Sequence, residues 1–280
     1  MFFALRLIVV AVVTERGFVH YEVVGRGQPV ILLHGWIGSW GLWHNTMDSL
    51  GDRFRCYAPE FWGFGSTSNN GGGFQIDDFV EMVDKFMDRL GIDSAPIIGH
   101  SMGGTVALSL ALNKPERVKQ IIVVGSPIVG KSLSLWLRIS GQSWAAKLLW
   151  KFPILLNTFL KLYAYQITNK PSIWYDMVIK DVSSTTLDSF FRSISSLHKT
   201  DLTTKVHEID VPILGIYGEQ DVVVAPAQAQ VLTKNIPHAK TVLLPDSGHF
   251  PMLDELEIFN DHLRYFLVNQ DMLPNHNQLF

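Results

Sequence analysis

Short runs of apolar residues alternate with segments of helical periodicity along most of this chain, and this rhythm constrains its fold more than any other feature. The runs lie at residues 29–35, 53–65 (a strand followed by a loop), 95–100, 118–126, 211–218 and 239–245. A strand without polar alternation is typical of a parallel sheet buried between two layers of helices. The chain is therefore predicted to be an α/β protein with a mostly parallel sheet and helices on both faces.

Segments between these runs carry helical patterns. In residues 75–90 the apolar side chains recur at helical spacing, as at Ile76, Phe79 and Val83, which indicates an amphipathic helix. Helices are also predicted at residues 102–113, 225–235 and 253–269. Residues 269–280 are polar and contain a proline, so they are predicted to form a frayed tail.

The rhythm stops between residues 126 and 204, which are rich in aromatic residues and read as helices without strands. This segment is predicted to be a helical cap, with residues 1–125 and 205–280 as the α/β core. Ligands bind at the carboxyl ends of parallel strands, so a lid over an apolar pocket is the favoured interpretation. A helical layer with no role in binding is the alternative. The aromatic residues include Trp136, Trp144, Trp150, Trp174, Phe152, Phe159, Tyr163, Tyr165, Tyr175, Phe190 and Phe191.

The first residues form a short apolar stretch that Arg6 interrupts and that stops at Thr14. A membrane-spanning helix needs about 20 apolar residues, and a signal peptide needs a positive start and a small-residue cleavage site. The β-branched run at residues 8–13 favours a strand. A targeting or anchor segment and a disordered extension are the alternatives. We expect no stable membrane span and a cytoplasmic location.

Composition and charge exclude some partners. Of the 280 residues, 47% are hydrophobic and 18% are charged, which suits a large buried core rather than disorder. The net charge is −3 and no basic cluster occurs, so nucleic acid is not an expected partner. Cys56 is the single cysteine and is predicted to be packed in a strand rather than reactive. The protein is expected to be a monomer or a homodimer.

The candidate nucleophile is Ser101, at the centre of a G-x-S-x-G motif in residues 99–103. A predicted strand precedes the motif and a predicted helix follows it, which is the context that a nucleophile at a sharp turn requires. The glycines leave room for such a turn. A glycine-rich turn without chemistry is the alternative, and a P-loop is excluded because the Gly-Lys-Ser/Thr signature is absent.

A serine nucleophile needs a base and a carboxylate that orients the base. His249 follows the last apolar strand, and Asp221 follows the strand before it, so both lie at the sheet edge that carries Ser101. Glu219 is the competing carboxylate and is interpreted as a turn residue. Asp246 and Asp254 flank His249 and are expected to cap a helix or to face water.

Two backbone N–H groups are expected to stabilise an oxyanion. They are those of Met102, after the nucleophile, and Trp36, in the loop after the strand at residues 29–33. Trp36 can also be a simple core aromatic. Trp36, His100 and Phe250 are predicted to line the substrate pocket, although His100 is expected to point away from the turn. His34 is expected to pin the loop that carries Trp36.

On these residues the chain resembles the α/β-hydrolase superfamily over about residues 19–268. The resemblance implies an eight-stranded α/β-hydrolase sheet with a helical cap, a Ser101–His249–Asp221 triad, and no cofactor or metal. Families in it that use an aspartate nucleophile are disfavoured by Ser101, and Glu60 stands where relatives often carry aspartate. The motifs are HGW at 34–36, EFWGFGSTS at 60–68, GHSMGG at 99–104, GEQD at 218–221 and SGHFPMLDE at 247–255.

The function predicted from these residues is a serine carboxylesterase that acts on small-molecule esters with short to medium acyl chains through an acyl-enzyme. A carbon–carbon bond hydrolase of vinylogous diketones is the first alternative, with Arg192 as a possible carboxylate anchor. A cofactor-free haloperoxidase or perhydrolase is the second. A ligand receptor or scaffold that kept the fold is the rival outside enzymology.

Overall fold

The computed structural model describes residues 10–68, 73–134 and 153–271. Of the features expected from the sequence, most of the apolar amino-terminal run and nearly all of the polar tail lie outside these residues. Four aromatic residues of the predicted cap also lie outside them: Trp136, Trp144, Trp150 and Phe152.

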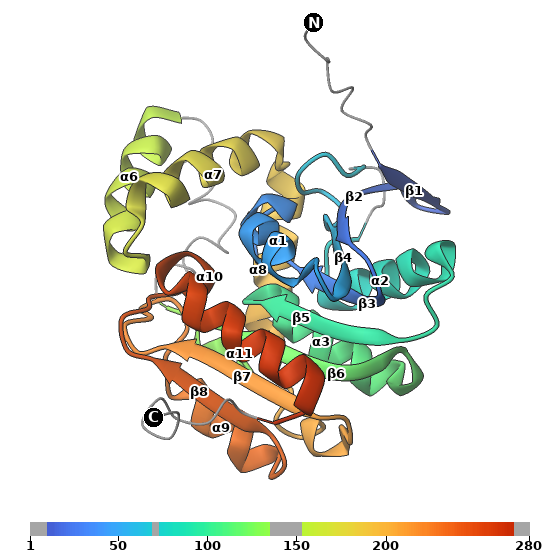
Figure 1. Ribbon diagram of the computed structural model, residues 1–280. Coiled ribbons are helices and arrows are strands. Elements are labelled where there is room, and N and C mark those ends of the chain that lie inside the picture. The colour runs from blue at the N-terminus through green and yellow to red at the C-terminus, as the bar shows by residue number, and fades with distance from the viewer. Residues whose placement is uncertain (1–9, 69–72, 135–152, 272–280) are drawn as a thin grey trace, which may run out of the picture.

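The core is a single sheet of eight strands in the order β1-β2-β4-β3-β5-β6-β7-β8 (Figure 1). β2 pairs antiparallel with β1 and β4, and every other neighbouring pair is parallel. The prediction of a mostly parallel, eight-stranded sheet is thus confirmed. The strands are β1 (Ala11–Thr14), β2 (Gly17–Gly25), β3 (Gln28–Leu33), β4 (Phe54–Pro59), β5 (Ala95–His100), β6 (Val118–Val124), β7 (Ile213–Gly218) and β8 (Lys240–Leu244).

Helices cover both faces because the parallel strands are apolar on both. Along β3, Ile31 and Leu33 pack in the cluster under α2, α3 and α9, whereas Val30 and Leu32 pack in the cluster under α1 and α11. Figure 1 shows α1 and α11 in front of the sheet and α2 and α3 behind it. These helices are α1 (His44–Leu50), α2 (Ile76–Leu90), α3 (Met102–Asn113), α9 (Gln228–Asn235) and α11 (Leu256–Asn269).

Two helix boundaries differ from the sequence prediction. Pro226 and Ala227 form a turn, so α9 begins at Gln228 rather than at residue 225. The helix expected at 253–269 is two helices, α10 (Pro251–Asp254) and α11, because the backbone of Glu255 is not helical (φ −125°, ψ 56°). This break places Asp254 at the end of α10, a position that the site uses.

Between β6 and β7 the described chain forms α6 (Pro153–Ile167), α7 (Pro171–Ser184) and α8 (Leu187–Lys199). α6 and α7 pack against each other beside the sheet, and α8 approaches α2 (Figure 1). Whether residues 126–204 act as a cap stays a prediction at this point. None of the helices in the described part of the chain is long and apolar enough to cross a lipid bilayer.

Candidate active site

Ser101 stands at the turn between β5 and α3 in a strained backbone conformation. Its φ is +50° and its ψ is −116°, a region that residues other than glycine rarely adopt. The turn is held because the backbone N–H of Ser101 donates to the carbonyl of Val124 at 2.8 Å. A Cβ on Gly99 would overlap the carbonyl of Gly103, and a Cβ on Gly103 would overlap that of Leu33. The glycines therefore permit the contacts that hold the turn.

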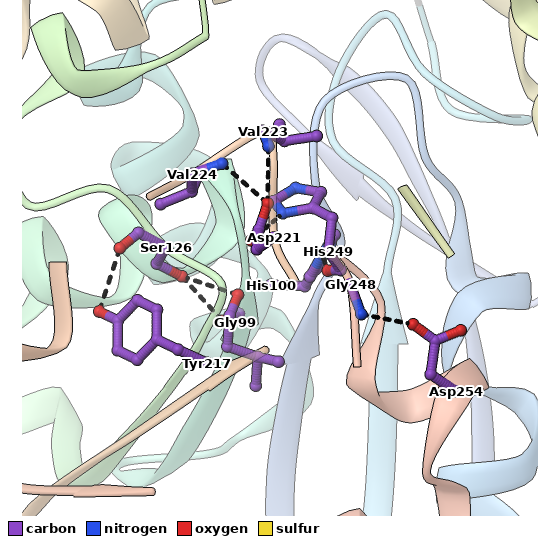
Figure 2. Close-up of polar contacts among 11 residues, drawn as sticks. Gly99, His100, Ser126, Tyr217, Asp221, Val223, Val224, Gly248, His249 and Asp254 are labelled. Carbon is purple, nitrogen blue, oxygen red and sulfur yellow. Dashed lines mark hydrogen bonds and ion pairs between the residues drawn. The ribbon is translucent and has the colours of Figure 1, made fainter. Parts of the chain in front are cut away.

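A second layer of polar contacts supports this turn from the end of β6. The Ser126 hydroxyl donates to the carbonyls of Val124 and Gly99, at 3.1 and 3.3 Å, and the Tyr217 hydroxyl donates to the carbonyl of Ser126 at 3.1 Å (Figure 2). Gly104 packs directly on Ser126, where any Cβ would overlap the hydroxyl. The first turn of α3 is thereby fixed to the end of β6.

Asp221 and His249 form a buried pair at the carboxyl ends of β7 and β8. Oδ2 of Asp221 lies 2.7 Å from Nδ1 of His249. Oδ1 accepts hydrogen bonds from the backbone N–H groups of Val223 and Val224, at 2.7 and 2.9 Å (Figure 2). Since both oxygens have donors, the carboxylate is fixed in one orientation and holds the Nδ1–H tautomer of His249.

The backbone of His249 is also held on both sides. Its N–H donates to the carbonyl of Ile167 at 2.8 Å, and its carbonyl lies 2.9 Å from Nε2 of His100. Burial, and then the neighbouring His249, lower the pKa of His100 well below its usual value. His100 is thus neutral at pH 7, with its proton on Nε2, and it donates to the His249 carbonyl. His100 is buried and contacts the candidate base rather than pointing away from the site; its role as a pocket residue stays a prediction.

Ser101 lies next to this pair without being bonded to it. Within the described residues the Ser101 hydroxyl makes no hydrogen bond to His249. Ser101 and His249 share neighbours. The ring of His100, the residue before Ser101, lies 4.7 Å from the ring of His249, measured between centroids. A Cβ on Gly125, directly after the Val124 that holds Ser101, would lie 3.3 Å from Nδ1 of His249. Bonds of this kind are often long before substrate is bound.

His34 fixes the loop that follows β3. Its Nε2 accepts the backbone N–H of Phe61 at 3.0 Å, so Nδ1 carries the proton and donates to the Gly35 carbonyl at 2.7 Å. Burial lowers the pKa of His34 to about 4, which keeps the ring neutral. The loop approaches the serine closely, because a Cβ on Gly35 would lie 3.2 Å from Cβ of Ser101. His34 therefore pins the loop that carries Trp36.

Two backbone N–H groups next to Ser101 have no partner in the described part of the chain, those of Trp36 and Met102. The Met102 group opens α3, where the first N–H groups of a helix have no intrahelical acceptor. The indole N–H of Trp36 donates to the carbonyl of Phe190 in α8 at 3.0 Å, and the two rings are 4.4 Å apart. That these two N–H groups bind an anionic oxygen stays a prediction.

Aromatic side chains surround the candidate base on its apolar side. The ring of Phe250 is 5.1 Å from that of His249, 4.9 Å from that of His100 and 6.0 Å from that of Trp174 in α7, measured between centroids. Phe250 is half-buried. The predicted pocket residues Trp36 and Phe250 thus each connect the core to one helix of the segment between β6 and β7.

Comparison with known proteins bears on this arrangement. A family model described as the alpha/beta hydrolase fold matches residues 28–159. The chain is 28% identical over 255 residues to the pimeloyl-[acyl-carrier protein] methyl ester esterase of Nitrosomonas europaea, covering 86% of this chain and 96% of that protein. The predicted resemblance to the α/β-hydrolase superfamily is thus confirmed.

Solved structures share the fold at low identity. The enol-lactonase of Burkholderia xenovorans is 19% identical, with a TM-score of 0.81 over 93% of this chain and 100% of that one. An esterase from Exiguobacterium antarcticum is 20% identical, with a TM-score of 0.78 over 90% of this chain and 96% of that one. At such identities the likeness concerns the fold.

Of the carboxylates near His249, the structure brings only Asp221 to its ring among the described residues. Glu219 and Asp246 are exposed. Sequence reasoning missed Asp254, whose Oδ2 accepts the backbone N–H of Gly248 at 2.8 Å. Its position five residues after His249 was a signal, but several acids share that stretch and nothing in the sequence separates them.

Proposed function

We propose that the protein is a serine hydrolase that cleaves carboxylic esters through an acyl-enzyme, with Ser101, His249 and Asp221 as its triad. The observation that carries the proposal is the buried Asp221–His249 pair at 2.7 Å beside a serine whose backbone is held at φ +50°. The match to the alpha/beta hydrolase fold and the esterase relatives support it.

In the first half of the reaction the Ser101 oxygen attacks the ester carbonyl carbon while Nε2 of His249 takes its proton. Asp221 accepts the bond from Nδ1 and stabilises the imidazolium that forms. The carbonyl oxygen becomes an anion, which the N–H groups of Trp36 and Met102 bind. His249 then protonates the leaving alcohol oxygen as its bond to carbon breaks, which leaves an acyl ester on Ser101.

In the second half water takes the place of the alcohol. His249 removes a proton from water, the resulting oxygen attacks the acyl carbon, and the proton returns to Ser101 as the acid leaves. The same two N–H groups bind the second oxyanion. No other reactant is needed, so the step balances as ester and water giving acid and alcohol.

The segment 126–204 is proposed to be the cap that shapes the acyl site. Trp174 and Phe190 of this segment contact Phe250 and Trp36 next to the triad, so the described walls are apolar. Such walls favour apolar acyl groups, and the proposed chains are of short to medium length. The relative from Nitrosomonas europaea is named as a methyl ester esterase, which supports esters of a small alcohol. A cytoplasmic location stays a prediction from the sequence.

Carbon–carbon bond hydrolysis is disfavoured by the position of Arg192. Its guanidinium pairs with Asp188 of the same helix at 3.4 Å, and its side chain is 43% exposed. It also lies over the ring of Phe74, at 6.0 Å from the centroid. These contacts describe a surface residue and not an anchor for a substrate carboxylate.

The test is a series of p-nitrophenyl esters from acetate upward, beside one dienolate substrate that loses colour on carbon–carbon cleavage. We expect hydrolysis of acetate and butyrate, and no bleaching of the dienolate. Ser101→Ala should abolish the ester activity. An enzyme that bleaches the dienolate and leaves the esters intact contradicts the proposal, and so does full activity in Ser101→Ala.

A further inference from the structure

The loop that carries His249 is fastened to the turn between α6 and α7 through one carboxylate, that of Asp254. Oδ1 accepts the hydroxyl proton of Thr168 at 2.5 Å and the backbone N–H of Asn169 at 2.7 Å. Oδ2 accepts the backbone N–H of Gly248 at 2.8 Å, as Figure 2 shows. The carboxylate thus bridges two segments that are about eighty residues apart in the sequence.

Backbone contacts reinforce the same junction. The N–H of His249 donates to the carbonyl of Ile167, the last residue of α6, at 2.8 Å. The side-chain amide of Asn169 also donates to the carbonyl of Asp246. Gly248 is required between them, because a Cβ there would overlap the Ile167 carbonyl. The backbone of the candidate base therefore rests directly on the end of α6.

The neighbouring acid makes contacts of a different kind. Glu255 accepts the hydroxyl proton of Ser247 at 2.6 Å and the backbone N–H of Asp246 at 3.1 Å, both within the loop itself. Asp246 is exposed, and its bonds here come from its backbone N–H and carbonyl. Asp254 is thus the acid whose bonds join the loop to the segment between β6 and β7.

We propose that Asp254 is a positioning residue that sets the place of His249 by locking its loop to the Thr168–Asn169 turn. The proposal rests on the ester hydrolysis proposed above, because it assigns a part in that reaction. The orientation of His249 toward Ser101 then depends on the position of α6, and a movement of that helix displaces the His249 ring. A misplaced base lowers the rate of the chemical step more than it weakens substrate binding.

The primary test is Asp254→Asn, with Asp246→Asn as the matched control. All three groups around Asp254 donate, so an amide, which has one acceptor oxygen, leaves at least one donor facing an NH2 group. We expect kcat on p-nitrophenyl acetate to fall by about tenfold to a hundredfold, with KM changed less than twofold. Asp246→Asn removes the same charge from the loop that Asp254 holds and should stay within twofold of the wild type. Asp254→Glu, which keeps both acceptors, should restore part of the loss.

Thr168→Val separates positioning from general stability. It removes one donor on the far side of the junction and leaves the loop sequence intact. We expect a smaller fall in kcat, and we expect Asp254→Asn/Thr168→Val to be no worse than Asp254→Asn alone, because both act through one junction. Effects that multiply would overturn the proposal.

Hydrogen exchange gives a readout that does not depend on activity. The N–H groups of Gly248 and His249 are bonded to Asp254 and Ile167, so peptides covering 246–250 should exchange faster in Asp254→Asn, while those of β5 and β6 stay unchanged. Wild-type exchange at 246–250 together with wild-type kcat refutes the proposal. If the wild type hydrolyses no ester, the proposed function fails, and this exchange measurement still decides whether Asp254 holds the loop. Thr168→Val supplies the same exchange test if Asp254→Asn does not fold.

Discussion

Replacing Asp221 with asparagine changes one atom of the site and should reverse the tautomer of His249. Oδ1 of Asp221 accepts two backbone N–H groups, from Val223 and Val224. An asparagine must keep its oxygen on that side, because an NH2 group there would face two donors. The NH2 group then points at Nδ1 of His249 and donates to it, which moves the ring proton to Nε2.

A histidine protonated at Nε2 cannot accept the proton of Ser101. Loss of the correct tautomer in a serine triad lowers kcat by about 10⁴-fold, or about 5.5 kcal/mol at about 1.4 kcal/mol for each tenfold change. The substitution is isosteric, and the ring keeps a hydrogen bond, so the melting temperature should change by a few degrees at most. KM should change little, because Asp221 is buried and its oxygens are bonded to Val223, Val224 and His249.

The assay is steady-state hydrolysis of p-nitrophenyl butyrate at pH 7.5, with Glu219→Gln as the control. Glu219 lies two residues before Asp221 on the same loop and is exposed, so its variant should keep wild-type kcat. Hydrolysis by Asp221→Asn within tenfold of the wild type would refute the reasoning about the tautomer. A large loss in Glu219→Gln would point to the other carboxylate.

The remaining predictions concern packing, pH and the acyl site. Gly104→Ala forces a methyl group onto the Ser126 hydroxyl, so urea unfolding should show a loss of about 1–3 kcal/mol; an unchanged midpoint contradicts this. Burial raises the pKa of Asp181 to about 6 from an ordinary 3.8, so the folded state holds this proton more tightly than the unfolded state. Its ionisation therefore lowers the free energy of unfolding as pH rises from about 4 to about 6, by up to about 3 kcal/mol. Asp181→Asn should gain stability relative to the wild type across that window, and a difference that is constant with pH contradicts the cause. Trp36→Phe loses the bond to the Phe190 carbonyl but keeps its backbone N–H, so KM for butyrate should rise about fivefold with kcat unchanged; a fall in kcat alone contradicts this.

The fold was predictable because its signals are local. Strands without polar alternation require helices on both faces, and the run from Val30 to Leu33 is divided between two helical layers in the structure. The Asp221–His249 pair was predictable for a related reason. Parallel strands end at one edge, so the loops after β7 and β8 lie side by side, and Asp221 and His249 are on these loops.

The roles of Asp254 and His100 could not be predicted from the sequence, because they depend on contacts between segments that are distant in the chain. Asp254 looks like any acid at a helix end, and its bonds to Thr168 and Asn169 exist only because α6 ends against the His249 loop. His100 looks like a neighbour of the nucleophile that points elsewhere, yet it donates to the carbonyl of His249. Neither contact follows from periodicity or from a motif.

Three loops of the site are each bonded to the segment between β6 and β7. Trp36 after β3 is bonded to α8, the backbone of Val223 after β7 accepts the N–H of Ser134, and the His249 loop is bonded to the end of α6. Each loop therefore has an attachment to the segment between β6 and β7. Substitution at the His249 attachment should therefore lower kcat, whereas substitution at the Trp36 attachment should raise KM.

The central claim is that Ser101 is the nucleophile, and covalent labelling tests it most directly. A fluorophosphonate reacts with a serine only where a base and an oxyanion site activate it. Intact-mass analysis should show one adduct per chain, with activity lost in the same proportion, and peptide mapping should place the adduct on Ser101. Neither His249→Ala nor Ser101→Ala should be labelled at a comparable rate. An adduct on another residue, or full activity in the labelled enzyme, would contradict the claim.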